Sequence, residues 1–312
     1  DPEMSRGLGD VYKRQIRLLR EMLKAKKTNY ASVPIYLTTF YREGVRYKQK
    51  FRNLTEAVFK IYKPSPLLNH FQDHVKLLKM SRIVNSQERD TLIAKISAGI
   101  DACLQLDIVK NLPDFLLPDD KGNVYSYASC DMTVIDNRLV NVISFRQNKG
   151  IKEPLYCGEL YIDAENNALV QARLEINPAY VRQATDMFIE RKTRKWKITA
   201  QEAVYTISYR QWNGIYYMNH IRGDLYFKVK LKRQWFSSSS LHTWFEMVTC
   251  KVDTDNVTRF QRKERMPTRT IFSDTHFKYD ADFWGEFNVI PWEEELGTVI
   301  EKLSSKIEQI EY

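Results

Sequence analysis

The sequence predicts a mainly β fold of the α+β class, in which a curled antiparallel sheet forms a half-barrel covered by a few helices. Three observations support this expectation. Apolar and polar residues alternate with a period of two over most of the chain, strand-like segments flank short turn sequences in pairs, and few segments have helical spacing. A succession of strands with short polar turns is typical of an antiparallel sheet, and the few helices then cover one of its faces.

The first fifteen residues are set apart from the rest of the chain. Asp1–Gln15, DPEMSRGLGDVYKRQ, have no periodic apolar face, and RGLGDVYKRQ resembles translated adapter sequence at the ends of unrelated reading frames from environmental sequencing. We therefore expect an artefactual or disordered tail outside the fold. If it is an artefact, the natural chain has been cut, and the missing signal peptide says nothing about its compartment.

From residue 16 onward we expect a single β-rich domain, residues 16–312, because the chain contains no internal repeat and no Pro/Gly-rich hinge. Apolar residues at helical spacing predict an amphipathic helix at about 16–27, which must lie on an apolar surface. A helical insertion is expected around 88–111. A C-terminal helix is expected around 293–310, where three acidic residues in the first turn suit the helix dipole.

The predicted strands are separated by recognisable turn sequences. The segment 35–63 predicts two or three long strands, broken near Gly44 and Asn53. Later strands form hairpins, because Asn and Gly accept the positive φ values that tight turns need. The expected turns are Asp136-Asn137, Asn166-Asn167 and Asn213-Gly214.

The composition limits the classes of partner that this protein is expected to have. The chain has 312 residues, a net charge of +9 and 43% hydrophobic residues, enough for a packed core. No apolar run approaches the roughly 18 residues of a spanning helix, so we expect no transmembrane helix, although peripheral membrane contact stays possible. Basic runs at 190–197, 228–233 and 259–265 are scattered and interleaved with acidic or apolar residues. This favours solvated sheet faces and no nucleic-acid partner, with a phosphate or anionic-lipid surface as the alternative.

No motif predicts catalysis, a cofactor or a metal. His70 and His74 have the i, i+4 spacing of metal ligands on a helix, but Phe71 replaces the Glu of the zinc-protease signature. The four cysteines show no CxxC pair and three lie in apolar strand patterns, so buried free thiols are the default and one disulfide is the alternative. They are Cys103, Cys130, Cys157 and Cys250. We expect no catalytic, cofactor-binding or metal-binding residue.

Four charged residues within apolar strand patterns are the candidate polar site. They are Arg42, Glu43, Arg222 and Asp224. Because buried charges are normally paired, these residues are expected either to form a cross-strand ion-pair cluster or to anchor the head group of a ligand. Simple exposure is the remaining alternative.

A possible apolar cavity is the second candidate site. If the curled sheet is open, its lining would include Phe40, Leu225, Phe227 and Val229. Such a cavity would accept an apolar guest, whereas a core filled by aromatic side chains would exclude one.

Several segments together carry a family resemblance. The motifs YLTTFYREGVRY, LTEAVFKIYKP, DIVKNLPDFL, VISFRQNKGIKEPLYCGELYID, HIRGDLYFKVKLK, IFSD and DADFWGEFNVI resemble the carboxyl-terminal region of Gram-negative envelope proteins called carboxypeptidase-like regulatory domain-containing proteins. The resemblance covers nearly everything from Ile16 onward. It implies a periplasmic or outer-membrane-associated full-length protein with an upstream signal peptide and β-sandwich. It implies no peptidase activity, because the zinc ligands of such an enzyme are missing.

The order of the predicted elements is also similar to that of periplasmic lipoprotein carriers, an analogy at the level of pattern. We therefore expect a non-catalytic cell-envelope protein, a binding or assembly module for a lipid, a lipoprotein or a partner protein. The alternative is a peptidase or hydrolase that acts on peptides or peptidoglycan.

Overall fold

The computed structural model describes residues 2–48, 50–65, 71–84, 99–118, 124–129, 131–189, 195–233, 237–269 and 307–311. Its strands are β1 (Ile35–Tyr47), β2 (Lys50–Lys63), β3 (His74–Val84), β4 (Tyr125–Ser129), β5 (Thr133–Ile135), β6 (Arg138–Gln147), β7 (Tyr156–Asp163), β8 (Leu169–Ile176), β9 (Trp196–Trp212), β10 (Ile215–Leu231), β11 (Ser239–Asp253) and β12 (Ile307–Glu311). Its helices are α1 (Pro2–Asn29), α2 (Ile100–Gln105) and the 3-10 helices η2 (Asp114–Leu116), η3 (Val181–Phe188) and η4 (Arg262–Glu264).

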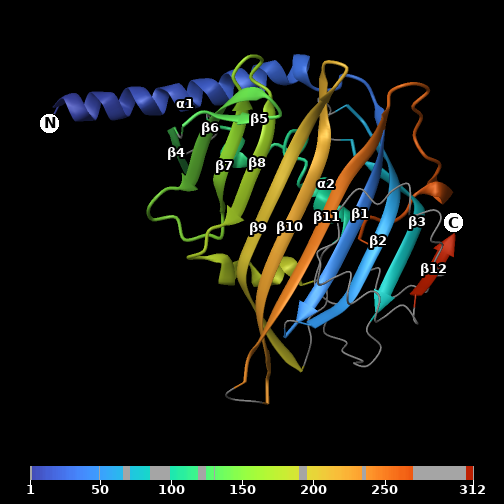
Figure 1. Ribbon diagram of the computed structural model, residues 1–312. Helices are drawn as coiled ribbons and strands as arrows, with labels where there is room; N and C mark the ends of the chain where they lie inside the picture. Colours follow the sequence, from blue (N-terminus) through green and yellow to red (C-terminus); the bar gives the residue numbers. More distant parts are fainter. Residues whose placement is uncertain are drawn as a thin grey trace.

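All twelve strands belong to one antiparallel sheet, which is twisted along its length (Figure 1). The order is β12-β3-β2-β1-β11-β10-β9-β8-β7-β6-β4, and β5 pairs with β6 next to β4. Among the described residues the two edges of this order do not pair with each other, so the sheet is open. The predicted mainly β fold with an antiparallel sheet and few helices is confirmed.

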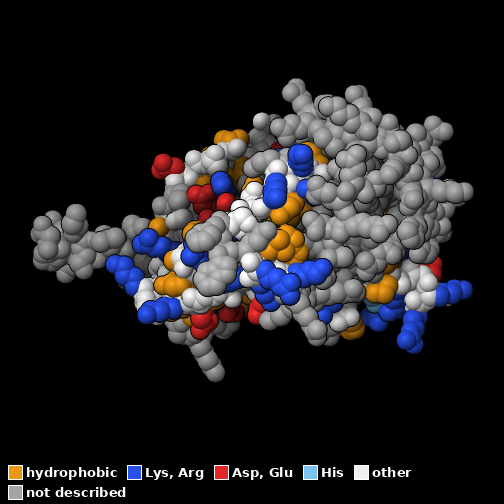
Figure 2. Space-filling view, turned by 90° about the horizontal axis from the view of Figure 1, so that it is seen from below, with side chains coloured by type: hydrophobic (Ala, Val, Ile, Leu, Met, Phe, Trp, Pro, Cys, Tyr) orange, Lys and Arg blue, Asp and Glu red, His pale blue; other side chains and the backbone are white. Residues whose placement is uncertain are grey.

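The sheet has an inner face, which carries the main hydrophobic core, and an outer face. Alternate residues of each strand point to the same face, and on β1 the odd-numbered residues, such as Leu37 and Tyr41, enter the core. Leu19 and Met22 of α1 and Cys103 of α2 join the same core. In Figure 1, α1 crosses the upper end of the sheet and α2 lies behind it. Figure 2 views the lower end, where Lys and Arg side chains border a strip of hydrophobic ones.

The three predicted turns are confirmed. Asp136 and Asn137 have φ values of 48° and 62°, and they connect β5 to β6. Asn167 has a φ of 59° between β7 and β8. Asn213 and Gly214 have φ values of 49° and 83° between β9 and β10, so each turn uses the left-handed backbone that its residues favour.

The expected breaks inside segment 35–63 are wrong, because Gly44 and Asn53 lie within β1 and β2. The connection between the two strands lies at Lys48, which has a φ of 51°. Gly44 has a packing role: a Cβ at this position would lie 2.7 Å from the Trp244 ring. The glycine therefore makes room for the indole on the outer face.

The first helix is longer than predicted. Residues 2–15, expected to be a tail outside the fold, continue α1 in the amino-terminal direction, and the Gln15 side chain is buried. Each of Gly7 and Gly9 costs a helix only about 1 kcal/mol, so a helix docked through its later turns can extend through them.

The other two helix predictions also need correction. Within 88–111 the structure has α2 only at Ile100–Gln105, and residues 85–98 lie outside the described part. At the carboxyl end, Ile307–Glu311 form strand β12 on the edge of β3, although a helix was predicted around 293–310. Residues 270–306 are not described. Pairing with an available strand edge prevails over a helical pattern here.

Of the two histidines with metal-ligand spacing, the described one, His74, lies on a strand and not on a helix. His74 begins β3 and stacks on the Tyr62 ring at 5.4 Å, and His70 is outside the described residues. In the described part of the chain, no three or more His, Cys, Asp or Glu side chains form a group that could hold a metal ion. No helix in that part is both long enough and apolar enough to cross a membrane.

Candidate functional site

A row of charged residues crosses the outer face of the sheet on four neighbouring strands. Arg42 of β1 lies opposite Glu56 of β2 and opposite Glu246 of β11, and Glu246 in turn lies opposite Arg222 of β10. Arg42 Nε donates a hydrogen bond of 2.8 Å to Glu56, and Arg222 Nη1 lies 3.4 Å from Glu246. Charges of opposite sign therefore alternate across the strands, which is the favourable cross-strand arrangement.

Asp224 and two histidines extend this charge row on β10 and β11. Asp224 accepts hydrogen bonds of 2.8 and 3.2 Å from Arg222, and it lies 2.9 Å from His242 Nε2. Burial would raise the pKa of Asp224, but the hydrogen bonds from His242 and Arg222 hold that pKa below its ordinary value. His220 lies 2.6 Å from Glu246.

Three of the four predicted polar residues therefore meet on one face, and Glu43 does not. Arg42 and Glu43 are consecutive in β1, so their side chains point to opposite faces of the sheet. Glu43 accepts a 2.6 Å hydrogen bond from Tyr41 Oη on the inner side. Burial raises the pKa of Glu56 although Arg42 draws it down, and only 2% of Arg42 is exposed. The charged residues of this row are therefore paired with one another within the sheet.

The four residues predicted to line a cavity also lie on two faces. Leu225, Phe227 and Val229 enter the inner core with 1–2% of their surfaces exposed, and the Phe227 ring contacts that of Phe188 at 5.8 Å. Phe40 belongs to a small cluster with Val58 on the outer face. These four side chains therefore do not line one common cavity.

A buried cluster of charged residues on the inner side was not predicted from the sequence. Lys63 Nζ lies 3.0 Å from Asp73 and 2.7 Å from Asp107, and Lys110 Nζ lies 2.5 Å from Asp73. Tyr209 Oη donates a 2.9 Å hydrogen bond to Asp107. The four charged side chains are only 4% exposed, so the cluster lies deep inside the protein. It connects the end of β2 with β9 and with the loop that follows α2.

The charges of this buried cluster stabilise one another. Burial would raise the pKa of Asp107, but Lys63 lowers it below the ordinary value. Burial would lower the pKa of Lys63, and Asp107 together with Asp73 raises it instead. The sequence signal was single charges in apolar surroundings, Lys63 after FKIY and Asp107 in LQLDIV. Such a signal indicates pairing but does not identify the partners.

A pocket lies where β10 and β11 part, and we name it the strand-split pocket. The ladder between these strands ends at His220 and Val248. Just beyond this pair, each strand contains a β-bulge, one extra residue without a partner on the neighbouring strand. Asn219 is the extra residue of β10 in its pairing with β9, and Cys250 is that of β11 in its pairing with β1. Such bulges bend and twist a strand, and they are enriched next to functional sites. Together with β9, the two strands border an open pocket of about 230 Å³.

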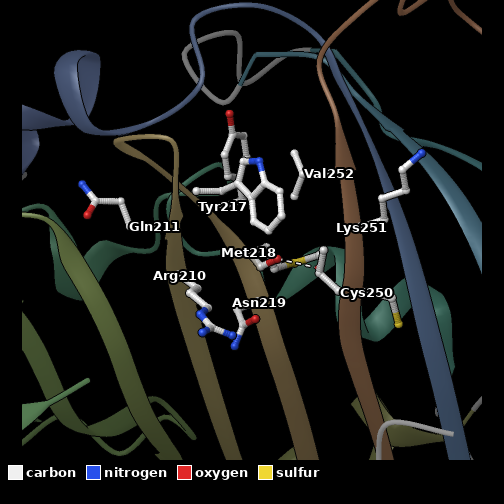
Figure 3. A pocket seen from close by; sticks show the side chains of 10 residues that line it. Arg210, Gln211, Tyr217, Met218, Asn219, Cys250, Lys251 and Val252 are labelled. Atoms are coloured by element: carbon white, nitrogen blue, oxygen red, sulfur yellow. Dashed lines mark hydrogen bonds between the residues drawn. The ribbon is translucent and has the colours of Figure 1, made fainter. Parts of the chain in front are cut away.

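Ten residues from three strands line the strand-split pocket (Figure 3). In that view Tyr217 and Asn219 come from β10, and Cys250 and Val252 lie across from them on β11. Thr249 Oγ1 donates a 2.6 Å hydrogen bond to the Met218 carbonyl, which bridges the two strands inside the pocket. The complete lining is Arg210, Gln211, Trp212, Tyr217, Met218, Asn219, Thr249, Cys250, Lys251 and Val252.

The pocket combines aromatic and cationic groups. The Trp212 side chain is 56% exposed, and burial raises the pKa of the partly buried Tyr217. Lys251 forms a 2.6 Å ion pair with Asp253, whereas no acidic partner of Arg210 is found among the described residues. The protein around Cys250 raises the pKa of its thiol, which disfavours the nucleophilic thiolate. These groups suit binding through stacking and charge.

The thiol prediction holds in part. Cys103, Cys157 and Cys250 are free, and Cys130 lies outside the described residues. Cys103 is buried as expected, but Cys157 is half-buried and Cys250 is exposed.

Comparisons with known proteins give only distant structural matches. No protein-family model matches the chain, and no curated protein matches it in sequence. A DUF1329 family protein from Desulfovibrio piger aligns over 82% of this chain and 99% of its own, with 10% identity and a TM-score of 0.37. A putative outer membrane lipoprotein-sorting protein domain from Vibrio parahaemolyticus aligns over 77% and 93%, with 8% identity and a TM-score of 0.32.

A lipovitellin structure described by its lipid–protein interactions aligns over 74% of this chain and 26% of its own, with 9% identity and a TM-score of 0.30. All three likenesses concern the fold alone, and at these TM-scores they carry no argument on function.

Proposed function

We propose that this protein is a non-catalytic binding module of the cell envelope that docks an extended segment of a partner protein at the strand-split pocket. One observation carries the proposal: the pocket gathers Trp212, Tyr217 and Arg210 on a single surface. Trp, Tyr and Arg are the residue types most enriched at the energetic centres of protein interfaces. The envelope location rests on the sequence resemblance given above.

The size of the pocket favours one anchoring side chain of a partner. Its volume of about 230 Å³ lies below the roughly 300–1,000 Å³ of clefts that bury a drug-sized ligand. Because Arg210 lacks an acidic partner among the described residues, a partner segment with an acidic residue beside an aromatic or aliphatic anchor is favoured.

The lipid alternative has less support from the described residues. A carrier of acyl chains needs apolar volume that its own side chains do not fill. Leu225, Phe227 and Val229 instead pack in the inner core. The strand-split pocket is lined partly by charged and amide groups, which suit an apolar chain poorly.

Peptide selection tests the proposal. A displayed library of random peptides is selected on the full chain. The enriched peptides are labelled with a fluorophore, and fluorescence anisotropy of the labelled peptides gives their affinities for the wild type and two variants. Trp212→Ala should weaken binding by about 30-fold or more, as truncation of a central interface residue does. Met132→Ala removes a comparably exposed side chain on the loop before β5 and should leave binding unchanged.

Three outcomes would contradict the proposal. Enriched peptides that bind Trp212→Ala as tightly as the wild type would place the site elsewhere. The carrier would be favoured if acyl chains were extracted from the purified protein and if a fluorescent fatty-acid probe bound Trp212→Ala as tightly as the wild type. Turnover of peptide or ester substrates that a chelator abolishes would favour the hydrolase.

A further inference from the structure

The fold brings two basic stretches of the sequence together at the lower end of β9 and β10. Lys197 of β9 lies directly opposite Lys230 of β10. The Lys232 amide donates a 2.9 Å hydrogen bond to the Lys195 carbonyl, which continues the contact beyond the strands. Lysines in directly opposed positions repel each other.

The hairpin turn between β1 and β2 adds basic residues to the same end. The Lys48 amide donates a 3.1 Å hydrogen bond to the carbonyl of Ser240, the second residue of β11. The Tyr47 ring contacts the Trp196 ring edge-on at 6.4 Å. Lys48 is exposed, as is Lys50 at the start of β2. Cations from three connected regions therefore surround one end of the sheet.

Lys195, Lys197 and Lys228 are exposed, and within the described part of the chain none of them forms an ion pair. Figure 2, seen from below, shows Lys and Arg side chains beside hydrophobic ones at this end of the molecule. The positive charges of Lys195, Lys197 and Lys228 are therefore available to an external partner.

An exposed apolar side chain lies at the same end of the sheet, on the inner side, whereas Lys197 and Lys228 lie on the outer face. Met187 of η3 is 66% exposed, and η3 is held to the lower part of β9 by a 2.9 Å hydrogen bond from the Ala200 amide to Thr185 Oγ1. Basic residues together with an exposed apolar side chain at one end of a molecule suit a surface that contacts the headgroup and acyl boundary of a bilayer. Nucleic acid phosphates would use the lysines but give no role to the methionine.

We propose that this basic end, formed by Lys48, Lys50, Lys195, Lys197 and Lys228 with Met187, docks peripherally on a membrane surface that contains anionic phospholipids. The lysines contact the lipid phosphates, and Met187 lies at the headgroup boundary. This surface is separate from the strand-split pocket, so it stands independently of the partner-binding proposal.

Vesicle flotation tests this docking. The full chain is mixed with vesicles of phosphatidylcholine alone or of equal parts phosphatidylcholine and phosphatidylglycerol, at low and at high salt. We expect binding to the phosphatidylglycerol vesicles that falls steeply with salt, because surface charges are screened. Each basic residue near such a surface contributes about fivefold to partitioning, so Lys195→Gln with Lys197→Gln and Lys228→Gln should weaken binding by about 100-fold.

A matched variant controls for net charge. Lys24→Gln, Lys27→Gln and Lys263→Gln together remove the same charge from exposed positions on α1 and η4, and this variant should float like the wild type. Circular dichroism and thermal melts confirm that both triple variants fold. Equal flotation of the two variants would overturn the proposal. So would a lack of binding to phosphatidylglycerol at low salt, or equally tight binding of random duplex DNA.

Discussion

Replacement of Asp107 by Asn tests whether the buried charge cluster stabilises the fold. The Asp107 carboxylate lies 2.7 Å from Lys63 Nζ and accepts a 2.9 Å hydrogen bond from Tyr209. Asn retains an oxygen that can accept the hydrogen bond from the Tyr209 hydroxyl, but it removes the negative charge. The cluster then holds two ammonium groups, of Lys63 and Lys110, against the single carboxylate of Asp73.

The expected cost follows from this charge imbalance. Removal of one partner from a buried ion pair destabilises a protein by about 3–5 kcal/mol. Asp73 still lies 3.0 Å from Lys63 in the variant, so the lower end of this range applies, about 3 kcal/mol. Lys63→Met in the Asp107→Asn background restores one ammonium group to one carboxylate. The loss of unfolding free energy in the double variant should therefore be about 1–3 kcal/mol smaller than the sum of the losses in the two single variants.

Urea unfolding of the wild type, both single variants and the double variant gives the comparison, with unchanged slopes as the check of two-state behaviour. Glu21→Gln is the control, because it breaks the exposed pair with Lys24, whose side chain is 72% exposed. It should change stability by less than about 0.5 kcal/mol. A cost below about 1 kcal/mol for Asp107→Asn, or strictly additive single effects, would refute the reasoning.

Three further predictions concern pH and packing. Lys63 lowers the pKa of Asp107 in the fold, so the charged carboxylate stabilises the protein fully above the unfolded pKa near 4. This stabilisation is lost as the pH falls through the lower folded pKa. In urea unfolding between about pH 5 and pH 2, the free energy of unfolding should therefore fall less for Asp107→Asn than for the wild type. Phe227→Ala removes a side chain that is 2% exposed and should cost about 3–5 kcal/mol, measured by urea unfolding. Gly158→Ala should destabilise by about 2 kcal/mol or more in the same assay, since Gly158 has a φ of +153° and its Cβ would lie 1.9 Å from the Arg173 carbonyl oxygen; wild-type stability in this variant would contradict the geometry.

The hairpins could be predicted from the sequence because their determinants are local. A tight turn needs positive φ values at one or two residues, and Asn213-Gly214 meets that need without help from the rest of the chain. The break expected at Gly44 was wrong because this glycine serves a non-local contact, the close approach of Trp244 from β11. A sequence identifies a glycine but does not show which neighbour needs the space.

The candidate site was predicted only in part for the same reason. Adjacent residues of a strand lie on opposite faces, so the alternation alone could have separated Glu43 from Arg42. The partners Glu56 and Glu246 depend on the register between strands, which long-range pairing sets. The strand-split pocket depends on bulges at Asn219 and Cys250, and each bulge is visible only against its neighbouring strand.

The carboxyl-terminal segment illustrates how a sheet edge can change an element. Ile307 and Ile310 have the i, i+3 spacing of a helix, and the segment was predicted as the end of one. In the structure these residues pair with Ile83 and Met80 at the edge of β3. An unpaired strand edge offers a row of backbone hydrogen bonds, and a segment that reaches it can satisfy its own backbone groups there.

The two proposed surfaces lie at opposite ends of the same strands. The strand-split pocket lies near Trp212, where β9 turns into β10, and the basic end lies near Trp196, where β9 begins. A strand of 17 residues with a rise of about 3.3 Å per residue is about 50 Å long, so membrane docking through the lysines would hold the pocket far from the bilayer. Because the Debye length is about 8 Å at physiological salt, the lipid charges should not influence Arg210. Peptide affinity should therefore be the same for vesicle-bound and free protein, and the lysine variants should leave it unchanged. A peptide affinity that changes when vesicles are added would show that the two surfaces are coupled through the sheet or lie closer than this geometry places them.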